Sequence, residues 1–509
     1  MRKLGIALLL SLGLVTVSLG ETGIEADALL GHIKFLASDD LRGRANGSEG
    51  LERAGDYVAQ QFKAAGLAPG EGAEGWFQPF ELIAGLTVGR GNSLSFEFQG
   101  KKATFVLGTS YYPLTAPGDN SPSAQLQHVP LVFAGYGIAV RDVGYDDYAG
   151  IDVNGKAVLI FSHEPQEHDT NSRLNGVRPM PQTSLVAKAT LARSKGARAL
   201  FVVSDPSHRA DEGQYSVFNG DPDAEDVGFP FPVVRVRRTE LQPLLDAWKL
   251  EAIARQIDTD LVPRSEVLRG ATVDYVEQLS KNRRTVRNVI GVLTGSDPAR
   301  AKEAIVIGAH YDHVGLGGHL SMSPERTGEI HNGADDNASG TASIIEIARV
   351  AHQERARFPR TLVFVAFAGE ERGLLGSAYY AEHPVVPIAN TVAMLNLDMV
   401  GRARGAVDIS GLEVSPSMEA DLKAAVQALG EGLTIERQGP GAGRSDDYNF
   451  SAHRIPAINF FTGFHADYHR PTDDWDKIDA IGTRRVATLA LELAAHIAER
   501  PSRPEFVQK

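Results

Sequence analysis

The sequence predicts an α/β fold built on a largely parallel sheet, and two observations lead to that prediction. Within residues 288–499, short apolar runs of strand length alternate with longer stretches that have helical periodicity. Side chains able to do chemistry follow directly after several of these expected strands, as they do at the carboxyl edge of parallel sheets. The composition agrees, because 43% hydrophobic and 23% charged residues in a chain of 509 are typical of a globular protein with several cores.

The charge balance and the residue types exclude several kinds of protein. Lys and Arg number 51 against 64 Asp and Glu, which gives a formal net charge of −13. A surface this acidic repels phosphate, so we expect no nucleic-acid partner. The chain contains no cysteine, which excludes disulfides, thiolate metal ligands and a cysteine nucleophile.

The N-terminus has the layout of a secretory signal peptide. Arg2 and Lys3 precede an apolar run over residues 4–17, and the small residues Ser18 and Gly20 follow that run. The alternative, a membrane anchor, needs about 20 apolar residues, and no other stretch of the chain is long and apolar enough. We therefore expect residues 1–20 to be removed and the mature protein to be exported, periplasmic or secreted, without stable membrane insertion.

Three further regions follow the signal. Residues 21–120 are expected to hold helices over 26–36 and 49–65 and strands within 86–107. A second unit over residues 121–262 shows strand patterns at 129–134, 156–161 and 198–203 and a helix pattern at 183–195. The most regular unit covers 263–500, before a tail over 501–509; its strands are expected at 288–293, 304–308, 361–367 and 392–397, and its helices at 339–352, 417–429 and 483–499.

Five short segments in the last unit carry imidazoles or carboxylates at a strand end or a helix start. They contain His310 and Asp312, Asp335 and Asp336, Glu370 and Glu371, Asp398, and Tyr468 and His469. Divalent metals accept such ligands. One ion needs only two histidines and a carboxylate, so this larger set suggests two ions about 3.5–4 Å apart that share a carboxylate. Ligand type alone allows Zn²⁺, Mn²⁺ or Co²⁺.

The adjacent pair Glu370 and Glu371 suggests a division of roles. Neighbouring side chains in an extended chain point to opposite sides, so one carboxylate can bind metal while the other faces the bound water as a general base. Asp312 projects on the same side as His310 and can hydrogen-bond to its imidazole. Each of these residues taken alone is also common in solvated loops, and sequence order does not show that the five segments meet.

The motifs around these residues resemble those of the M28 family of zinc metallopeptidases, which includes secreted bacterial aminopeptidases and glutamate carboxypeptidases. The matching motifs are Gly308-Ala309-His310-Tyr311-Asp312, Gly333-Ala334-Asp335-Asp336-Asn337, Glu370-Glu371-Arg372-Gly373, Asn396-Leu397-Asp398-Met399 and Tyr468-His469-Arg470-Pro471. The resemblance implies a three-layer αβα sandwich with a mixed, largely parallel sheet over 263–500. Residues 121–262 resemble, more weakly, the protease-associated (PA) domain, a β-rich insert.

Carried over position by position, the resemblance implies two zinc ions per chain. His310 and Asp398 would bind one ion, Glu371 and His469 the other, and Asp335 would bridge both. Glu370 would be the general base that activates a metal-bridging water, Asp312 would orient His310, and Tyr468 would help stabilise the oxyanion. A non-proline cis peptide is expected between Asp335 and Asp336, and Ser445-Asp446 resembles a motif whose loop shapes the pocket.

These roles predict a zinc-dependent exopeptidase with peptide substrates, and an aminopeptidase first of all. A carboxypeptidase is the alternative, for which Arg402, Arg404 and Arg444 are candidate partners of a substrate carboxylate. A non-catalytic binding protein would be expected to have lost ligands, and none is lost. The acidic pairs and the middle unit argue against a single-zinc acyltransferase such as glutaminyl cyclase. His313, His319 and His331 either wall the pocket or are solvated loop residues, and the oligomeric state stays open.

Overall fold

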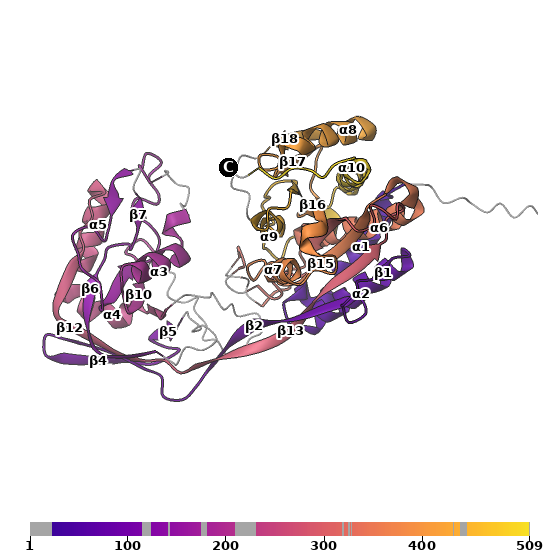
Figure 1. Ribbon diagram of the computed structural model, residues 1–509. Helices are drawn as coiled ribbons and strands as arrows, with labels where there is room; N and C mark the ends of the chain where they lie inside the picture. Colours follow the sequence, from indigo (N-terminus) through magenta and orange to yellow (C-terminus); the bar gives the residue numbers. More distant parts are fainter. Residues whose placement is uncertain are drawn as a thin grey trace, which may run out of the picture.

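The computed structural model describes two lobes, each built around its own sheet (Figure 1). The described residues are 23–113, 124–140, 143–174, 181–208, 231–317, 320–323, 326, 328–430, 432–437 and 445–507. The expected signal peptide lies outside them, as do His319 and Arg444.

The larger sheet has nine strands with parallel strands at its centre. Its order is β1-β13-β15-β14-β16-β19-β17-β18, and β2 also pairs with β13. β14 pairs in parallel with β15 and β16, and β16 with β19, whereas β13 and β17 run antiparallel to their inner neighbours. The bounds are β1 Ala68–Pro69, β2 Phe77–Val88, β13 Leu279–Leu293, β14 Ala304–His310, β15 Thr361–Phe367, β16 Thr391–Leu397, β17 Ala406–Ser410, β18 Thr434–Arg437 and β19 Ala457–Phe461.

Successive residues of the central strands point to opposite faces of this sheet, and both sets are apolar. Helices therefore cover both faces. Ile305 and Ile307 of β14 pack in one core with α1 (Ala26–Leu36), α2 (Glu49–Ala64), α6 (Gly340–Gln353), α8 (Glu419–Leu429) and α10 (Ala480–Glu499). Val306, between them, faces a second core that includes residues of α7 (Leu375–Glu382) and α9 (Asp447–Ala452). The predicted three-layer αβα sandwich with a mixed, largely parallel sheet is confirmed.

The second lobe holds an eight-stranded sheet in the order β4-β3-β12-β6-β9-β10-β11-β5. β6, β9, β10 and β11 are parallel neighbours, and the outer strands are antiparallel. One face packs against α4 (Arg238–Ala247) and α5 (Leu250–Asp260), and the other against α3 (Leu185–Ser194). The bounds are β3 Ser93–Phe98, β4 Lys101–Phe105, β5 Tyr111–Pro113, β6 Gln125–Phe133, β9 Ala157–Phe161, β10 Ala199–Val203, β11 Val233–Val236 and β12 Glu266–Val276; β7 (Ala139–Val140) and β8 (Tyr145–Asp146) pair separately.

A long antiparallel ribbon of β2 and β13 runs between the two sheets (Figure 1). The eight-stranded sheet extends beyond both bounds expected for the middle unit, 121 and 262, because β3, β4 and β12 pair into it. The domain division and the likeness to a PA domain stay predictions. Among the described residues, no helix combines the length and apolar character needed to cross a bilayer.

Arg360 ties the start of β15 to the end of α10. Its guanidinium is buried and donates to the carbonyl oxygens of Ile497, Ala498 and Arg500 at 2.8–3.0 Å, and to Glu303 Oε2 at 2.7 Å. Helix C-termini leave carbonyl groups without intrahelical partners, and a buried cation there satisfies them and opposes the helix dipole.

We expect Arg360→Met to destabilise the protein by about 2–4 kcal/mol, because buried carbonyl groups lose their donors while the stem volume is kept. Thermal unfolding followed by calorimetry measures this. The control Lys423→Met removes an exposed ion pair with Glu419 and should change stability by less than about 0.5 kcal/mol. Equal effects of the two changes would contradict the role assigned to Arg360.

Candidate functional site

Three of the five expected segments are adjacent at the carboxyl edge of the central strands. His310 is the last residue of β14, and β14 lies between β15 and β16 in parallel register. Glu370 and Glu371 follow β15, and Asp398 follows β16 directly. Strand order alone therefore brings these three segments together.

The other two segments reach the same edge from a helix start and a loop. Residues Ala334–Ser339 form a short irregular helical turn before α6 and contribute Asp336. The loop after β19 contributes His469, whose backbone has φ 50°. Nδ1 of His469 lies 2.9 Å from the carbonyl oxygen of Leu320, which leaves Nε2 to face the carboxylates.

Two groups of side chains form there, and Asp336 belongs to both. In the first group, Nε2 of His310 lies 3.3 Å from Oδ1 of Asp398 and 3.4 Å from Oδ1 of Asp336. In the second, Nε2 of His469 lies 3.1 Å from Oδ2 of Asp336 and 3.1 Å from Oε2 of Glu371. The two oxygens of Asp336 thus face different histidines.

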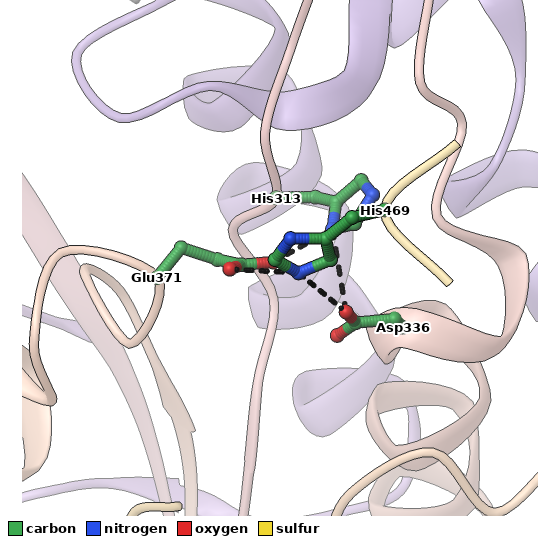
Figure 2. A group of neighbouring side chains, drawn as sticks. All are labelled: His313, Asp336, Glu371 and His469. Carbon is green, nitrogen blue, oxygen red and sulfur yellow. Dashed lines mark hydrogen bonds and ion pairs between the residues drawn. The ribbon is translucent and has the colours of Figure 1, made fainter. Parts of the chain in front are cut away.

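Figure 2 shows the second group, with the imidazoles of His313 and His469 and the carboxylates of Asp336 and Glu371 turned toward one another. Nδ1 of His313 lies 2.8 Å from Oε1 of Glu371 and 3.9 Å from Oδ2 of Asp336. His313 is 2% exposed. The interpretation of His313 as a solvated loop residue is therefore wrong, and His331 is buried as well.

Asp336, and not Asp335 as expected for the bridging ligand, is the carboxylate that faces both histidines. Asp335 is fully buried but turns away from both groups: its Oδ2 lies 3.1 Å from Nε2 of His465, and its Oδ1 accepts from the backbone N–H of Gly401 at 2.6 Å. The cis peptide lies between Asp336 and Asn337, not between Asp335 and Asp336 as expected. Nothing in the sequence indicates which of two adjacent carboxylates turns toward the histidines, and the irregular turn decides it.

Asp335 has a supporting position instead. His465, its partner, lies on the loop that leads to Tyr468 and His469. Arg402 braces the same loop through Asp467 Oδ2 at 3.3 Å and Asp473 Oδ1 at 2.8 Å. Both contacts restrain the position of His469.

Glu370 and Asp312 lie beside the first group. Oε2 of Glu370 is 3.8 Å from Nε2 of His310. Oδ1 of Asp312 lies 3.7 Å from Nδ1 of His310, which is 3.2 Å from the Asp312 carbonyl oxygen. The Asp312 carboxylate also accepts from Asn46 Nδ2 at 2.7 Å and from the backbone N–H groups of Glu370 and Glu371 at 3.2 and 3.3 Å. Asp312 therefore contacts both the first histidine and the Glu-Glu turn.

Tyr468 and Asp446 border the same region. The Tyr468 ring stacks on the His469 imidazole, with centroids 3.9 Å apart and planes at 24°. Asp446 precedes α9 and is fully buried, and burial raises the pKa of its carboxyl to about 7. Ser445 accepts from Asn396 Nδ2 at 2.7 Å and fixes this loop to β16.

Arg44 is a residue of the site framework that sequence reasoning missed. Its guanidinium is buried and donates to the carbonyl oxygens of Leu36, Tyr311 (2.8 Å), Asn332 (2.7 Å) and Gly333 (3.0 Å). Burial lowers the pKa of Arg44 to about 10 even though nearby carboxylates oppose it. Arg44 thus joins the N-terminal segment to the loops that carry His310 and Asp336. No sequence pattern pointed to it, since a lone arginine in a polar turn is ordinary.

Burial and mutual charge shift the protonation of this centre strongly. Burial alone would lower the pKa of His469, but Glu371 and Asp336 raise it to about 11. Burial alone would raise the pKa of Glu371, but His469 lowers it to about 2. Burial raises the pKa of Glu370 well above its usual range, and neighbouring carboxylates outweigh the opposing effect of His310. The carboxylates therefore require positive charge among them.

The donor set fits two zinc ions. Each group combines an imidazole nitrogen with carboxylate oxygens, which are the ligands that Zn²⁺ takes in proteins. The buried Nε2 atom of His469 has no hydrogen-bond partner of good geometry among the described residues, as expected for an atom whose partner is a cation. His310, Asp336 and Asp398 could hold one ion, and Asp336, Glu371 and His469 the other.

Comparison with known proteins agrees with this geometry. The model of peptidase family M28 matches residues 288–494, which span the strands and loops of the site. This match covers less than half of the chain and shows that these residues resemble peptidase family M28. The resemblance suggested by the five motifs is thereby confirmed.

Proteins similar to this chain include aminopeptidases. A probable leucine aminopeptidase 1 from Trichophyton verrucosum is 40% identical over 123 residues, which are 23% of this chain and 31% of that protein's length. An aminopeptidase from Aneurinibacillus sp. strain AM-1 shares the fold with a TM-score of 0.57 and 24% identity, over 96% of this chain and 97% of that chain. BSAP, a zinc aminopeptidase from Bacillus subtilis, does so with a TM-score of 0.52 and 20% identity, over 93% and 95%. At these identities the two structures show a common fold across both lobes.

We expect Asp336→Asn to remove most of the bound zinc and Asp335→Asn to retain it, because only Asp336 faces both histidines. Elemental analysis after equilibration with zinc measures this on the full chain. Zinc loss in Asp335→Asn with full retention in Asp336→Asn would show that Asp335 is the bridging ligand and that Asp336 is not.

The zinc-free protein should lose stability as the pH rises. The pKa of His469 is raised in the fold, so its proton stabilises the folded state fully below the unfolded value of about 6.5, and this contribution is lost as the pH approaches about 11. Chelator-treated protein should therefore show a Tm that falls between pH of about 6.5 and 9.5. The His469→Gln variant should show a weaker dependence of Tm on pH. Equal slopes in the two proteins would contradict the stabilising role of the His469 proton.

Proposed function

We propose that this chain is an exported zinc aminopeptidase that uses two zinc ions to hydrolyse the N-terminal peptide bond of peptides. One observation carries the proposal: two imidazole–carboxylate groups share Asp336, and Glu370 lies beside the first of them without being needed as a ligand. The match of residues 288–494 to the M28 family model and the aminopeptidase names of relatives support it.

The bound ions would supply Lewis-acid polarisation of the peptide carbonyl and a more acidic water. His310 and Asp398 are the proposed ligands of one ion and Glu371 and His469 of the other, with Asp336 shared. Asp312 positions these ligands through its contacts with His310 and with the backbone of the Glu-Glu turn.

Glu370 is the proposed general base and acid. Its carboxylate takes a proton from the attacking water and delivers it to the leaving amine. Burial raises the pKa of Glu370 well above its usual range, and a base with a raised pKa holds the proton between the two transfers. The backbone N–H of Glu370 donates to Asp312, which fixes the turn from which the side chain extends.

Tyr468 is proposed to donate a hydrogen bond to the developing oxyanion. Burial raises the pKa of Tyr468 well above its usual range, so its hydroxyl stays protonated at neutral pH and remains a donor. Stacking on His469 holds the ring next to the second group.

The acidic side chains of the site favour a substrate amine over a substrate carboxylate. Glu370, Asp446 and Asp447 lie around the two groups, and their oxygen atoms can accept hydrogen bonds from a terminal amine. Among the arginines considered for a carboxylate, Arg402 is already paired with Asp467 and Asp473, and Arg404 is exposed. Arg444 lies outside the described residues.

Aromatic side chains next to His469 support a preference for an apolar terminal residue. Phe464 is 58% exposed and lies edge-on to Tyr468, with ring centroids 4.9 Å apart, and to Phe461 at 5.1 Å. An apolar substrate side chain would cover this exposed ring.

Export is proposed from the N-terminal sequence. The basic pair Arg2 and Lys3 and the apolar run over 4–17 support delivery to the periplasm or the medium. Peptides in that compartment are the proposed substrates.

We expect Glu370→Gln to lower kcat/KM by about 10²–10⁴-fold, because general acid–base catalysis is lost while metal ligands are kept. The assay is hydrolysis of leucine and phenylalanine chromogenic amides, with zinc content measured on the same samples. Glu382→Gln, an exposed change on α7, is the matched control. Full activity in Glu370→Gln, or a parallel loss of zinc, would contradict the assigned role.

Free-amine substrates should be cleaved and N-blocked peptides with free carboxyl ends should not. A panel of leucyl, phenylalanyl, lysyl and aspartyl amides, run beside N-acetylated dipeptides, tests this directly. Cleavage of only the blocked peptides would assign a carboxypeptidase, and a faster rate on aspartyl than on leucyl amides would contradict the apolar preference.

A further inference from the structure

A second cluster of histidines and carboxylates lies in the other lobe, at the carboxyl ends of β9 and β10. These strands are parallel neighbours, and β10 lies near α3 in Figure 1. His163 comes shortly after β9, and Asp205 and His208 come shortly after β10. The rule that places reactive groups at the carboxyl edge of parallel strands therefore applies to this sheet as well.

Both histidines of this cluster face one carboxylate oxygen. Nδ1 of His163 lies 2.7 Å from Oδ2 of Asp205, and Nδ1 of His208 lies 2.9 Å from the same oxygen. The two imidazole rings stack with centroids 3.7 Å apart and planes at 30°. One ligand atom from each of the three residues lies within 4.8 Å of the others.

A further carboxylate and an opening border the cluster. Oε2 of Glu167 is buried and lies 3.4 Å from Nε2 of His208. A cavity of about 290 Å³, lined by His163 and Glu167 among others, reaches the same place. Glu167 thus faces the ring nitrogen of His208 opposite the one beside Asp205, and the cavity gives a path by which an ion can enter.

The backbone holds His163 in place at an energetic cost. His163 has φ 52° and Gln166 has φ 58°, a region that residues with side chains rarely adopt. Such conformations persist where the surroundings determine them, and they cluster at functional sites. The buried Nζ of Lys188 supports the turn because it donates to the carbonyl oxygen of His163.

Asp205 is available as an anionic ligand. It is 2% exposed; burial alone would raise its pKa, but its contacts with His163 and His208 lower that pKa to about 2. Ser162 Oγ and the backbone N–H of Ser207 also donate to its carboxylate, at 3.3 and 2.8 Å, and fix its orientation.

We propose that His163, Asp205 and His208 bind a further zinc ion, and that Glu167 orients the His208 ring through its Nε2 atom. Two imidazoles and a carboxylate match the ligands of Zn²⁺ and Co²⁺, whereas Ca²⁺ takes six to eight oxygens and is disfavoured. The ion replaces the protons that the two Nδ1 atoms share with Asp205. This site has no residue in common with the centre around Asp336, so it does not depend on the proposed function.

The first test counts zinc on the full-length protein. After stripping and equilibration with Zn²⁺, wild type should hold one equivalent more than His163→Ala/His208→Ala. The control His128→Ala removes an exposed histidine of the same lobe and should hold as much as wild type. Equal zinc content in wild type and the double variant would overturn the proposal.

The second test needs no variant and so holds even if the double variant fails to fold. Diethyl pyrocarbonate modifies accessible histidines, and His163 and His208 have side chains that are 33% and 20% exposed. Peptide mass spectrometry should show that Zn²⁺, but not Ca²⁺, slows modification of both at least tenfold while His128 stays reactive. Equal modification with and without Zn²⁺ would overturn the site, and equal protection by Ca²⁺ would overturn the assignment of zinc.

Discussion

The lobe built around the nine-stranded sheet depends on how many carboxylates it holds close together in one place. The buried Asp312 and Asp336 and the largely buried side chains of Glu370 and Glu371 surround two histidines at the edge of the sheet. Like charges at these distances repel strongly in a medium of low polarity. Without cations the structure compensates through protons: His310 and His469 hold theirs far above the usual pH range, and Glu370 is driven toward its neutral form. Two divalent ions would remove the same imbalance.

The repulsion among these carboxylates explains why residues that are not proposed ligands hold the surrounding loops through several hydrogen bonds. The Arg44 guanidinium binds the carbonyl oxygens of both ligand-bearing loops, and it does so without neutralising any carboxylate directly. Asp312 fixes the Glu-Glu turn through two backbone N–H groups, and Asp335 does the same for the loop of His469 through His465. Ligands that repel each other keep their places because the backbone around them is held by such bonds.

Much of the fold was predictable, because its signals are local. The helix expected at 26–36 is α1 with the same bounds, and β15 matches the strand expected at 361–367, since amphipathic periodicity and β-branched runs report directly on burial. The order of the motifs also indicated the five segments. The sequence did not show which member of the Asp335–Asp336 pair faces the histidines, or that His313 is buried. Whether Asp335 or Asp336 faces the histidines depends on a backbone turn, and the burial of His313 depends on contacts with Glu371 and His469, which are distant in sequence.

The arrangement of parallel strands around β14 also determines when, along the chain, all segments of the site are present. His310 and His469 are far apart in the sequence, and His469 lies on the loop that follows β19, the strand that joins the sheet beside β16. A chain that ends before β19 lacks His469 and therefore half of the centre. The group around His469 can form only once β19 and the loop after it are in place.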